Sequence, residues 1–175
     1  KQQLVFRPER PVSRGAFAGR LRAEVLPALA AREPARLKAV YTERPPPRLS
    51  LVPFSRRPAA VVSWWGEADA PRAFPGFRVA AYEVEEAVPR AYERTWPDGE
   101  PSPGVNLLTL FARRPGLDDA TFFARWHGGH TPLSLAIHPL WAYVRNVVRR
   151  ALDGAPALDG IVEEQFRSDD DLLRP

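Results

Sequence analysis

Residues 122–133 read Phe-Phe-Ala-Arg-Trp-His-Gly-Gly-His-Thr-Pro-Leu, and they follow Asp118, a residue type that commonly caps helix N-termini. Side chains with the spacing of one helical face are Phe122, Trp126, His130 and Leu133. This spacing predicts an amphipathic helix that begins near Asp118 and turns this face toward a sheet. We therefore expect the imidazole of His130 to point inward.

The same pattern occurs 105 positions earlier, which indicates an internal repeat. Ser13 stands in the N-cap place of Asp118, and Pro27 stands in the place of Pro132. The earlier apolar face consists of Phe17, Leu21, Val25 and Ala28. Chance similarity of two amphipathic helices is the alternative. In a true repeat Val25 takes the place of His130, so we expect a site in the second copy and a scaffold in the first.

Short apolar runs follow and precede both helices and complete two copies of a strand-helix-strand-strand unit. The first copy has them at residues 4–7, 37–43, 59–66 and 78–84, and the second at 105–112, 141–148 and 160–166. A short helix or turn is expected around residues 70–77, and the acidic residues 168–171 should begin a second helix of the second copy. The order βαββαβ is ferredoxin-like. We predict an α+β fold of two tandem ferredoxin-like units, the second incomplete at the C-terminus.

Proline and glycine mark the boundaries of the two copies. Residues 97–104 are rich in both and predict a linker, so the N-terminal repeat covers residues 1–96 and the C-terminal repeat 104–175. The three prolines at 45–47 predict an irregular connection, because proline cannot donate the hydrogen bond that a central strand needs. The chain contains no methionine, so we expect residues missing before Lys1.

Composition restricts the classes of function. The absence of cysteine excludes disulfides and cysteine-based sites and is typical of the reducing cytoplasm. The 25 basic and 21 acidic residues are scattered, whereas a nucleic-acid interface needs clustered basic residues. No apolar run reaches the roughly 20 residues that cross a bilayer, and no nucleotide-binding loop or nucleophile elbow is present. We expect a cytoplasmic protein without a cofactor that binds neither nucleic acid nor membrane.

Residues 122–133 resemble the EthD family in the pattern F-x-x-x-W-x-x-x-H-x-P-L on its first helix. Residues 143–146, Tyr-Val-Arg-Asn, resemble the next strand of that family, and the likeness extends over residues 105–168. The resemblance implies ferredoxin-like units whose sheets pair, usually between two chains, into a dimeric-type α/β barrel with a cavity. Because this chain carries two repeats, one chain could form such a barrel, and a homodimer is also compatible with the resemblance.

The resemblance implies a cavity for a small aromatic or hydrophobic molecule and leaves three functions open. The first is a cofactor-independent, oxidoreductase-associated enzyme with His130 as general acid or base, since imidazole titrates near neutral pH. The second is a polyketide-type cyclase or dehydratase, which is a lyase. The third is a non-catalytic accessory protein that binds the ligand. The remaining alternative is a structural protein whose cavity is filled by its own side chains. The alternative for His130 itself is a core histidine bonded to a backbone carbonyl.

Further residues are candidates for the same cavity. Asn146 is the second catalytic candidate, because its amide could polarise a substrate carbonyl or orient the imidazole of His130; the alternative is a structural turn or edge amide. Strand alternation places Tyr143 and Asn146 on opposite faces unless a bulge intervenes, and it turns one of Trp64 and Trp65 inward. The predicted substrate-binding side chains are all aromatic: Trp126, Tyr143, Tyr41, Trp64 and Phe122. Tyr41 is included because it matches Asn146 at the offset of 105, and ordinary packing is the alternative for each aromatic residue.

Two further features of the second helix bear on a site. The three histidines, His127, His130 and His138, lie close together, but no carboxylate completes a ligand set, so we predict no metal site. Two consecutive glycines, Gly128 and Gly129, weaken a helix by about 0.5–1 kcal/mol each relative to alanine. Close approach of backbone or ligand would explain them, and a helix kink is the alternative.

Overall fold

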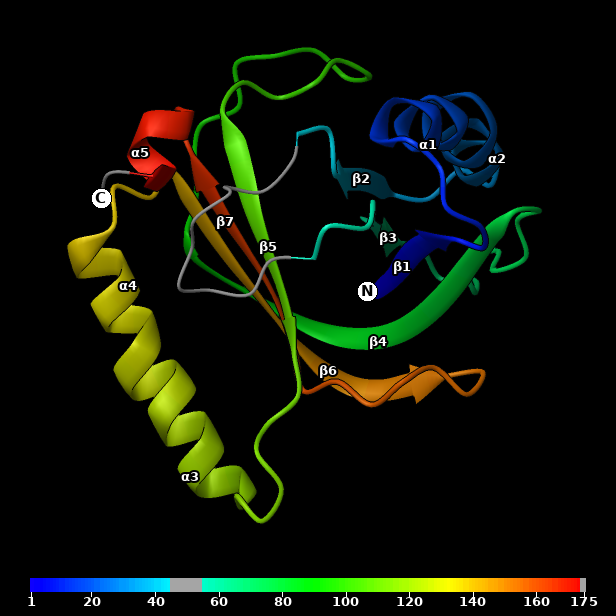
Figure 1. Cartoon of the computed structure of the whole chain (residues 1–175). Coiled ribbons are helices and arrows are strands. Elements are labelled where there is room, and N and C mark those ends of the chain that lie inside the picture. Colours follow the sequence, from blue (N-terminus) through cyan, green and yellow to red (C-terminus); the bar gives the residue numbers. More distant parts are fainter. Residues whose placement is uncertain (45–54, 174–175) are drawn as a thin grey trace. The chain divides into compact units, whose positions relative to one another are not determined.

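A computed structural model describes residues 1–44 and 55–173, so the predicted proline connection at 45–47 lies outside the described residues (Figure 1). The chain forms two compact units, Lys1–Val84 with Arg150–Pro156, and Glu85–Arg149 with Ala157–Pro175. Each unit combines helix with antiparallel strands, which confirms the α+β class. These units differ from the predicted repeats because two long strands, β4 (Phe77–Arg90) and β6 (Ala142–Leu152), each contribute residues to both.

The described residues of the first unit form a helical segment and a sheet in the order β2-β3-β1-β4. The other strands are β1 (Gln2–Pro8), β2 (Arg36–Tyr41) and β3 (Ala60–Trp65). The helical segment comprises α1 (Arg14–Arg20), the π turn η1 (Leu21–Val25) and α2 (Leu26–Ala30). Ser13 is its N-cap, as predicted, and the hydroxyl accepts a hydrogen bond from the Ala16 N–H at 3.2 Å. We predicted a short helix or a turn around residues 70–77, and the structure has a turn there. In this turn the Phe77 N–H donates to the Phe74 carbonyl.

The two faces of the first sheet differ in chemistry. The face toward the helical segment is apolar, and its buried core includes Leu4, Phe6, Val62 and Trp64 of the strands and Phe17, Leu21, Val25 and Leu29 of the helices. The opposite face carries two buried polar side chains, Gln3 and Ser63, and the Gln3 amide donates to the Ser63 hydroxyl at 3.0 Å. A buried polar pair of this kind is tolerated because its members bond to each other.

The second unit has the corresponding elements. Its sheet runs in the order β4-β6-β7-β5, with β5 at Val105–Phe111 and β7 at Gly160–Phe166. The helices are α3 (Asp119–Phe123), the π turn η2 (Ala124–His130), α4 (Thr131–Ile137) and α5 (Asp169–Leu173). Asp118 caps α3 by accepting from the Thr121 N–H at 2.8 Å, as predicted, and α5 is the beginning of the second helix expected from the acidic residues.

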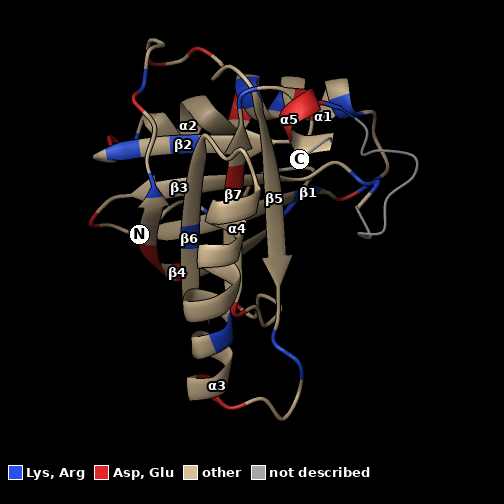
Figure 2. Ribbon diagram, turned by 90° about the vertical axis from the view of Figure 1, so that its left-hand side faces the viewer, with Lys and Arg blue, Asp and Glu red and all other residues tan. Residues whose placement is uncertain are grey.

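Charge is sparse on the long helical segment of the second unit, which is almost entirely tan in Figure 2. Between Asp119 and Ile137 only Asp119 and Arg125 are charged. No helix in the described ranges is both long and apolar enough to span a membrane.

Both helical segments contain a π turn immediately before a proline. In the first segment the Leu26 N–H donates to the Leu21 carbonyl, and in the second the Thr131 N–H donates to the Trp126 carbonyl. Each bond spans five residues instead of four. The next residues are Pro27 and Pro132. Proline lacks an N–H, and its ring clashes with the carbonyl four positions earlier in a regular helix. The wider π turn moves that carbonyl away from the ring. The same distortion therefore occurs in both helical segments, 105 positions apart.

Candidate functional site

The side chain of His130 is exposed, so the expectation that it points toward the sheet is wrong. The π turn is the physical reason. Regular helical spacing from Trp126 would turn His130 inward, but in the wider turn the next buried residue is Thr131, followed by Ser134. Leu133, predicted on the same inward face, is 57% exposed. The closest polar neighbour of the imidazole is the Ser134 hydroxyl, 3.4 Å from Nδ1.

Asn146 is buried on the face of the sheet opposite to the helical segment. Along β6, Tyr143 and Val147 pack in the core under the helix, so alternation directs Asn146 to the other side. The predicted separation of Tyr143 and Asn146 is therefore confirmed. The Asn146 amide donates to the Ile161 carbonyl at 3.1 Å. The predicted cooperation of Asn146 with His130 is wrong, because the sheet separates the two side chains.

Tyr41 does not correspond to Asn146. In β2 the side chains that pack toward the helix are Leu37, Ala39 and Tyr41, whereas in β6 they include Tyr143 and Val147. The inward faces of β2 and β6 therefore match at an offset of 106 and not at 105. A slip of one residue exchanges the two faces of a strand. Tyr41 packs against the core of the first unit, as Val147 does in the second.

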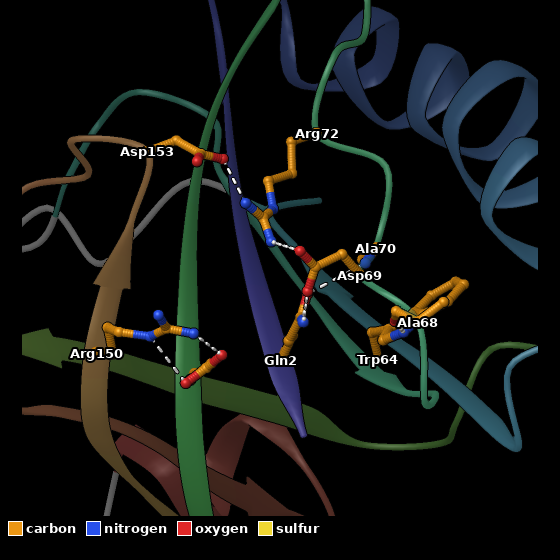
Figure 3. A network of polar contacts seen from close by, with 9 residues as sticks. Gln2, Trp64, Ala68, Asp69, Ala70, Arg72, Arg150 and Asp153 are labelled. Atoms are coloured by element: carbon orange, nitrogen blue, oxygen red, sulfur yellow. Dashed lines mark hydrogen bonds and ion pairs between the residues drawn. The ribbon is translucent and has the colours of Figure 1, made fainter.

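Trp64 is also a core residue of the first unit. Its indole is buried, and Nε1 donates to the Ala68 carbonyl at 3.1 Å (Figure 3). The adjacent Trp65 is only partly buried and lies near the Arg36 guanidinium, 4.7 Å from the ring centroid. One indole therefore points into the core and the other does not, as alternation predicts. Trp64 belongs to the first unit, whereas Phe122, Trp126 and Tyr143 belong to the second.

Phe122, Trp126 and Tyr143 meet beneath the helix of the second unit. The rings of Phe122 and Trp126 lie 5.5 Å apart, and all three side chains belong to one buried cluster. A methyl group on Gly160 would approach the Trp126 ring to 2.5 Å, so the indole lies directly on β7. Three predicted substrate-binding residues thus come together, but they form a closed core.

Polar groups also lie in this core, and sequence reasoning missed them. The Thr131 hydroxyl donates to the Trp126 carbonyl and accepts from Nη1 of Arg145, each at 3.0 Å. Glu164 pairs across the strands with Tyr143, and burial raises the pKa of both side chains. Alternation along residues 160–166 was a usable signal, because it places Glu164 on the apolar side of β7.

The histidines provide no metal site. His127 is partly buried, with its ring 4.8 Å from that of Trp126. Burial lowers the pKa of His127, and the positive charges of Arg145 and Arg149 lower it further, which favours the neutral imidazole. In the part of the chain that the structure describes, no group of three histidine, cysteine or acidic side chains could hold a metal ion.

An open hollow lies beside Trp141, in the second unit. One lobe has a volume of about 480 Å³ and is lined by Glu93, Thr95, Pro103, Trp141 and Arg167. A second lobe of about 410 Å³ shares three of these residues and adds Arg90, Ala91, Tyr92 and Leu140. We refer to both lobes together as the Trp141 hollow. It differs from the predicted site, because no residue of the second helical segment lines it.

A cluster of aromatic rings borders the Trp141 hollow. The centroid of Tyr92 lies 5.2 Å from that of Trp96 and 5.0 Å from that of Trp141, and all three side chains are partly exposed. The guanidinium carbon of Arg167 lies 5.2 Å from the centroid of Trp141. Sequence reasoning missed this cluster because its members are isolated aromatic residues in the sequence and only the folding of the second unit joins them.

Arg90 supports the hollow from the end of β4. Its Nη1 donates to the Leu140 carbonyl at 2.9 Å and its Nη2 to the Leu135 carbonyl at 3.4 Å. One bond joins Arg90 to α4 and the other to the connection between α4 and β6, next to Trp141. The charged side chains among the described residues of the lining are two guanidinium groups, Arg90 and Arg167, and one carboxylate, Glu93, so positive charge predominates.

The sequence of the chain matches no protein-family model and no curated protein.

Proposed function

We propose that this chain binds a small aromatic molecule in the Trp141 hollow. The observation that carries this proposal is an open volume of about 480 Å³ next to a cluster of three aromatic rings and a guanidinium group. Sites for small molecules have volumes of roughly 300–1,000 Å³ and combine aromatic walls with a few polar groups. An aromatic ligand would gain about 0.5–1.5 kcal/mol from ring contacts beyond the burial of its surface.

The accessory, ligand-binding function is the one of the three expected functions that this geometry supports best. The enzymatic functions, oxidation or cyclisation and dehydration, were expected from His130 with Asn146. These two side chains lie on different sides of the sheet, and His130 is exposed. An acid-base role for His130 stays a prediction with no supporting neighbour beyond the Ser134 hydroxyl.

The same proposal includes an EthD-like origin of the fold, as two tandem ferredoxin-like units. It is supported by the matching strand orders, β2-β3-β1 in the first unit and β6-β7-β5 in the second, and by the π turn before Pro27 and Pro132. The first unit departs from the βαββαβ pattern because residues 66–76 contain no helix. Pairing of the repeats into a dimeric-type α/β barrel stays a prediction.

Tryptophan fluorescence tests the binding proposal. Trp141 lines the hollow and Trp96 lies next to it, with ring centroids 5.8 Å apart, so a bound aromatic compound should change the emission in a saturable way. We expect at least one compound to bind in a panel of one- and two-ring aromatic acids, amides, alcohols and amines. Trp141→Leu should weaken its binding about tenfold or more, which corresponds to ~1.4 kcal/mol. Isothermal titration calorimetry measures the affinities of the variants independently of fluorescence.

Trp65→Leu is the matched control, because Trp65 is also a partly exposed indole beside an arginine but belongs to the first unit. Its affinity for the ligand should equal that of the wild type. The melting temperature of each variant, measured without ligand, establishes that the protein is folded. Absence of saturable binding across the panel, or equal losses in the two variants, would overturn the proposal.

A further inference from the structure

We propose that the aromatic ligand of the Trp141 hollow is a carboxylate, and that the guanidinium of Arg167 binds its anionic group. This inference rests on the proposed function and adds the charge of the ligand to it. Three features of the second unit support it: the position of Arg167, the carboxylate partners of the other arginines, and the charges that surround the hollow.

Arg167 lies at the boundary between aromatic and polar surface. Its guanidinium carbon is 5.2 Å from the centroid of Trp141, and its side chain lines both lobes of the hollow. A guanidinium that stacks on an aromatic ring keeps its N–H edge free for a planar carboxylate, which it can bind through two parallel hydrogen bonds. An aromatic acid could therefore place its ring at the aromatic cluster and its carboxylate at this edge.

Several other arginines of the chain have carboxylate partners. Ion pairs join Arg113 to Asp159, Arg149 to Glu85, Arg150 to Glu83 and Arg72 to Asp153. Across residues 1–44 and 55–173, Arg167 has no such ion pair. Arg167, one of the two arginines that line the hollow, thus retains a charge that a ligand can compensate.

The remaining charges make a carboxylate a better ligand than an ammonium group. Arg90 adds a second positive charge, and its donors bind the Leu135 and Leu140 carbonyls, which keeps the guanidinium in place. Glu93 is the one carboxylate in the lining and opposes an anion. With two guanidinium groups against one carboxylate, an anionic ligand meets net attraction, although exposure to water screens it.

Three ligands that share one ring system test the charge of the ligand: 2-naphthoate, 2-naphthamide and 2-naphthylmethylamine. Calorimetric titration of the full chain at pH 7 should give an affinity for the naphthoate about tenfold higher than for the neutral amide, with the amine weakest. Rising salt should weaken the binding of the naphthoate and leave that of the amide nearly constant.

Arg167→Gln should remove the preference for the naphthoate while the amide still binds with its wild-type affinity. Arg125→Gln is the matched control, since it removes an equal charge from an exposed position on the second helical segment and should preserve the preference. Equal affinities for naphthoate and amide, tightest binding of the amine, or an unchanged preference in Arg167→Gln would overturn the inference. If none of the three compounds binds while other panel members do, the carboxylate assignment alone is wrong; if no aromatic compound binds, the proposed function itself fails.

Discussion

The side chains of Glu164 and Tyr143 show how burial changes residue chemistry in the second unit. They face each other across β6 and β7 on the side covered by the helical segment. Removal from water disfavours the charged form of each group, so burial raises the pKa of the Glu164 carboxyl and of the Tyr143 hydroxyl. The protonated carboxyl therefore suits this position better than the carboxylate.

The raised pKa of Glu164 predicts a pH-dependent cost to stability. The folded-state pKa of Glu164 lies above the unfolded-state value of about 4.3. The stability that the neutral carboxyl contributes is therefore fully present below the unfolded-state pKa. It is lost as the pH rises through the folded-state pKa. Glu164→Gln keeps the shape without the charge. Its melting temperature relative to the wild type should therefore increase from pH 4 toward pH 8, measured by thermal unfolding. A difference that stays constant over this range would contradict the assignment.

At the scale of elements, the π turn before Pro132 decides which side chains of the second helical segment reach the sheet. It turns Thr131 inward and leaves His130 exposed. Trp126 is the anchor of the segment, because its ring contacts Phe111 edge-on with centroids 4.9 Å apart and lies over Gly160. Close approach of another described segment does not explain Gly128 and Gly129. A methyl group on either glycine would meet no atom within 4 Å outside the backbone of its own helix.

Gly160→Ala should destabilise the protein by about 1–3 kcal/mol, because the new methyl group would meet the rings of Trp126 and Phe111 at 2.5 Å. Gly128→Ala is the matched control in open space, and it should stabilise the protein by about 0.5–1 kcal/mol through the lower conformational entropy of the unfolded chain. Urea unfolding of both variants measures these changes. A neutral Gly160→Ala would show that the indole does not pack on β7 as described.

On the scale of the whole molecule, residues far apart in the sequence complete each unit. Figure 3 shows Arg72 between the carboxylates of Asp69 and Asp153, while Gln2 donates to Asp69 at 2.6 Å. Asp153 belongs to the segment Arg150–Pro156, which joins the first unit after the whole second helical segment has been completed. The Tyr82 hydroxyl donates to the Pro156 carbonyl at 3.0 Å and ties down the end of this segment.

Arg72→Met should loosen the segment Arg150–Pro156, since it removes the ion pair with Asp153 and keeps most of the side-chain volume. We expect faster amide hydrogen exchange there and a loss of stability of up to about 1 kcal/mol, because the carboxylates that it leaves are largely exposed to water. Arg94→Met is the control, as Arg94 pairs with Asp98 four residues away. Equal exchange in both variants would show that the Arg72 pair does not hold the segment.

The amino-acid sequence by itself determined the two helix N-caps, the positions of the helices and of most strands, and the α+β class, because caps and periodicity act between residues close in the chain. It could not determine the face on which His130 lies. The hydrogen bond from the Thr131 N–H to the Trp126 carbonyl forms a π turn, which shifts the inward face of the helix by one position. Nor could the sequence show that Tyr41 and Val147 both face the core of their units, because a shift of one residue exchanges the faces of a strand. Only the tertiary structure joined Tyr92, Trp141 and Arg167, since the pairing and packing of distant segments brings together side chains that share no local pattern.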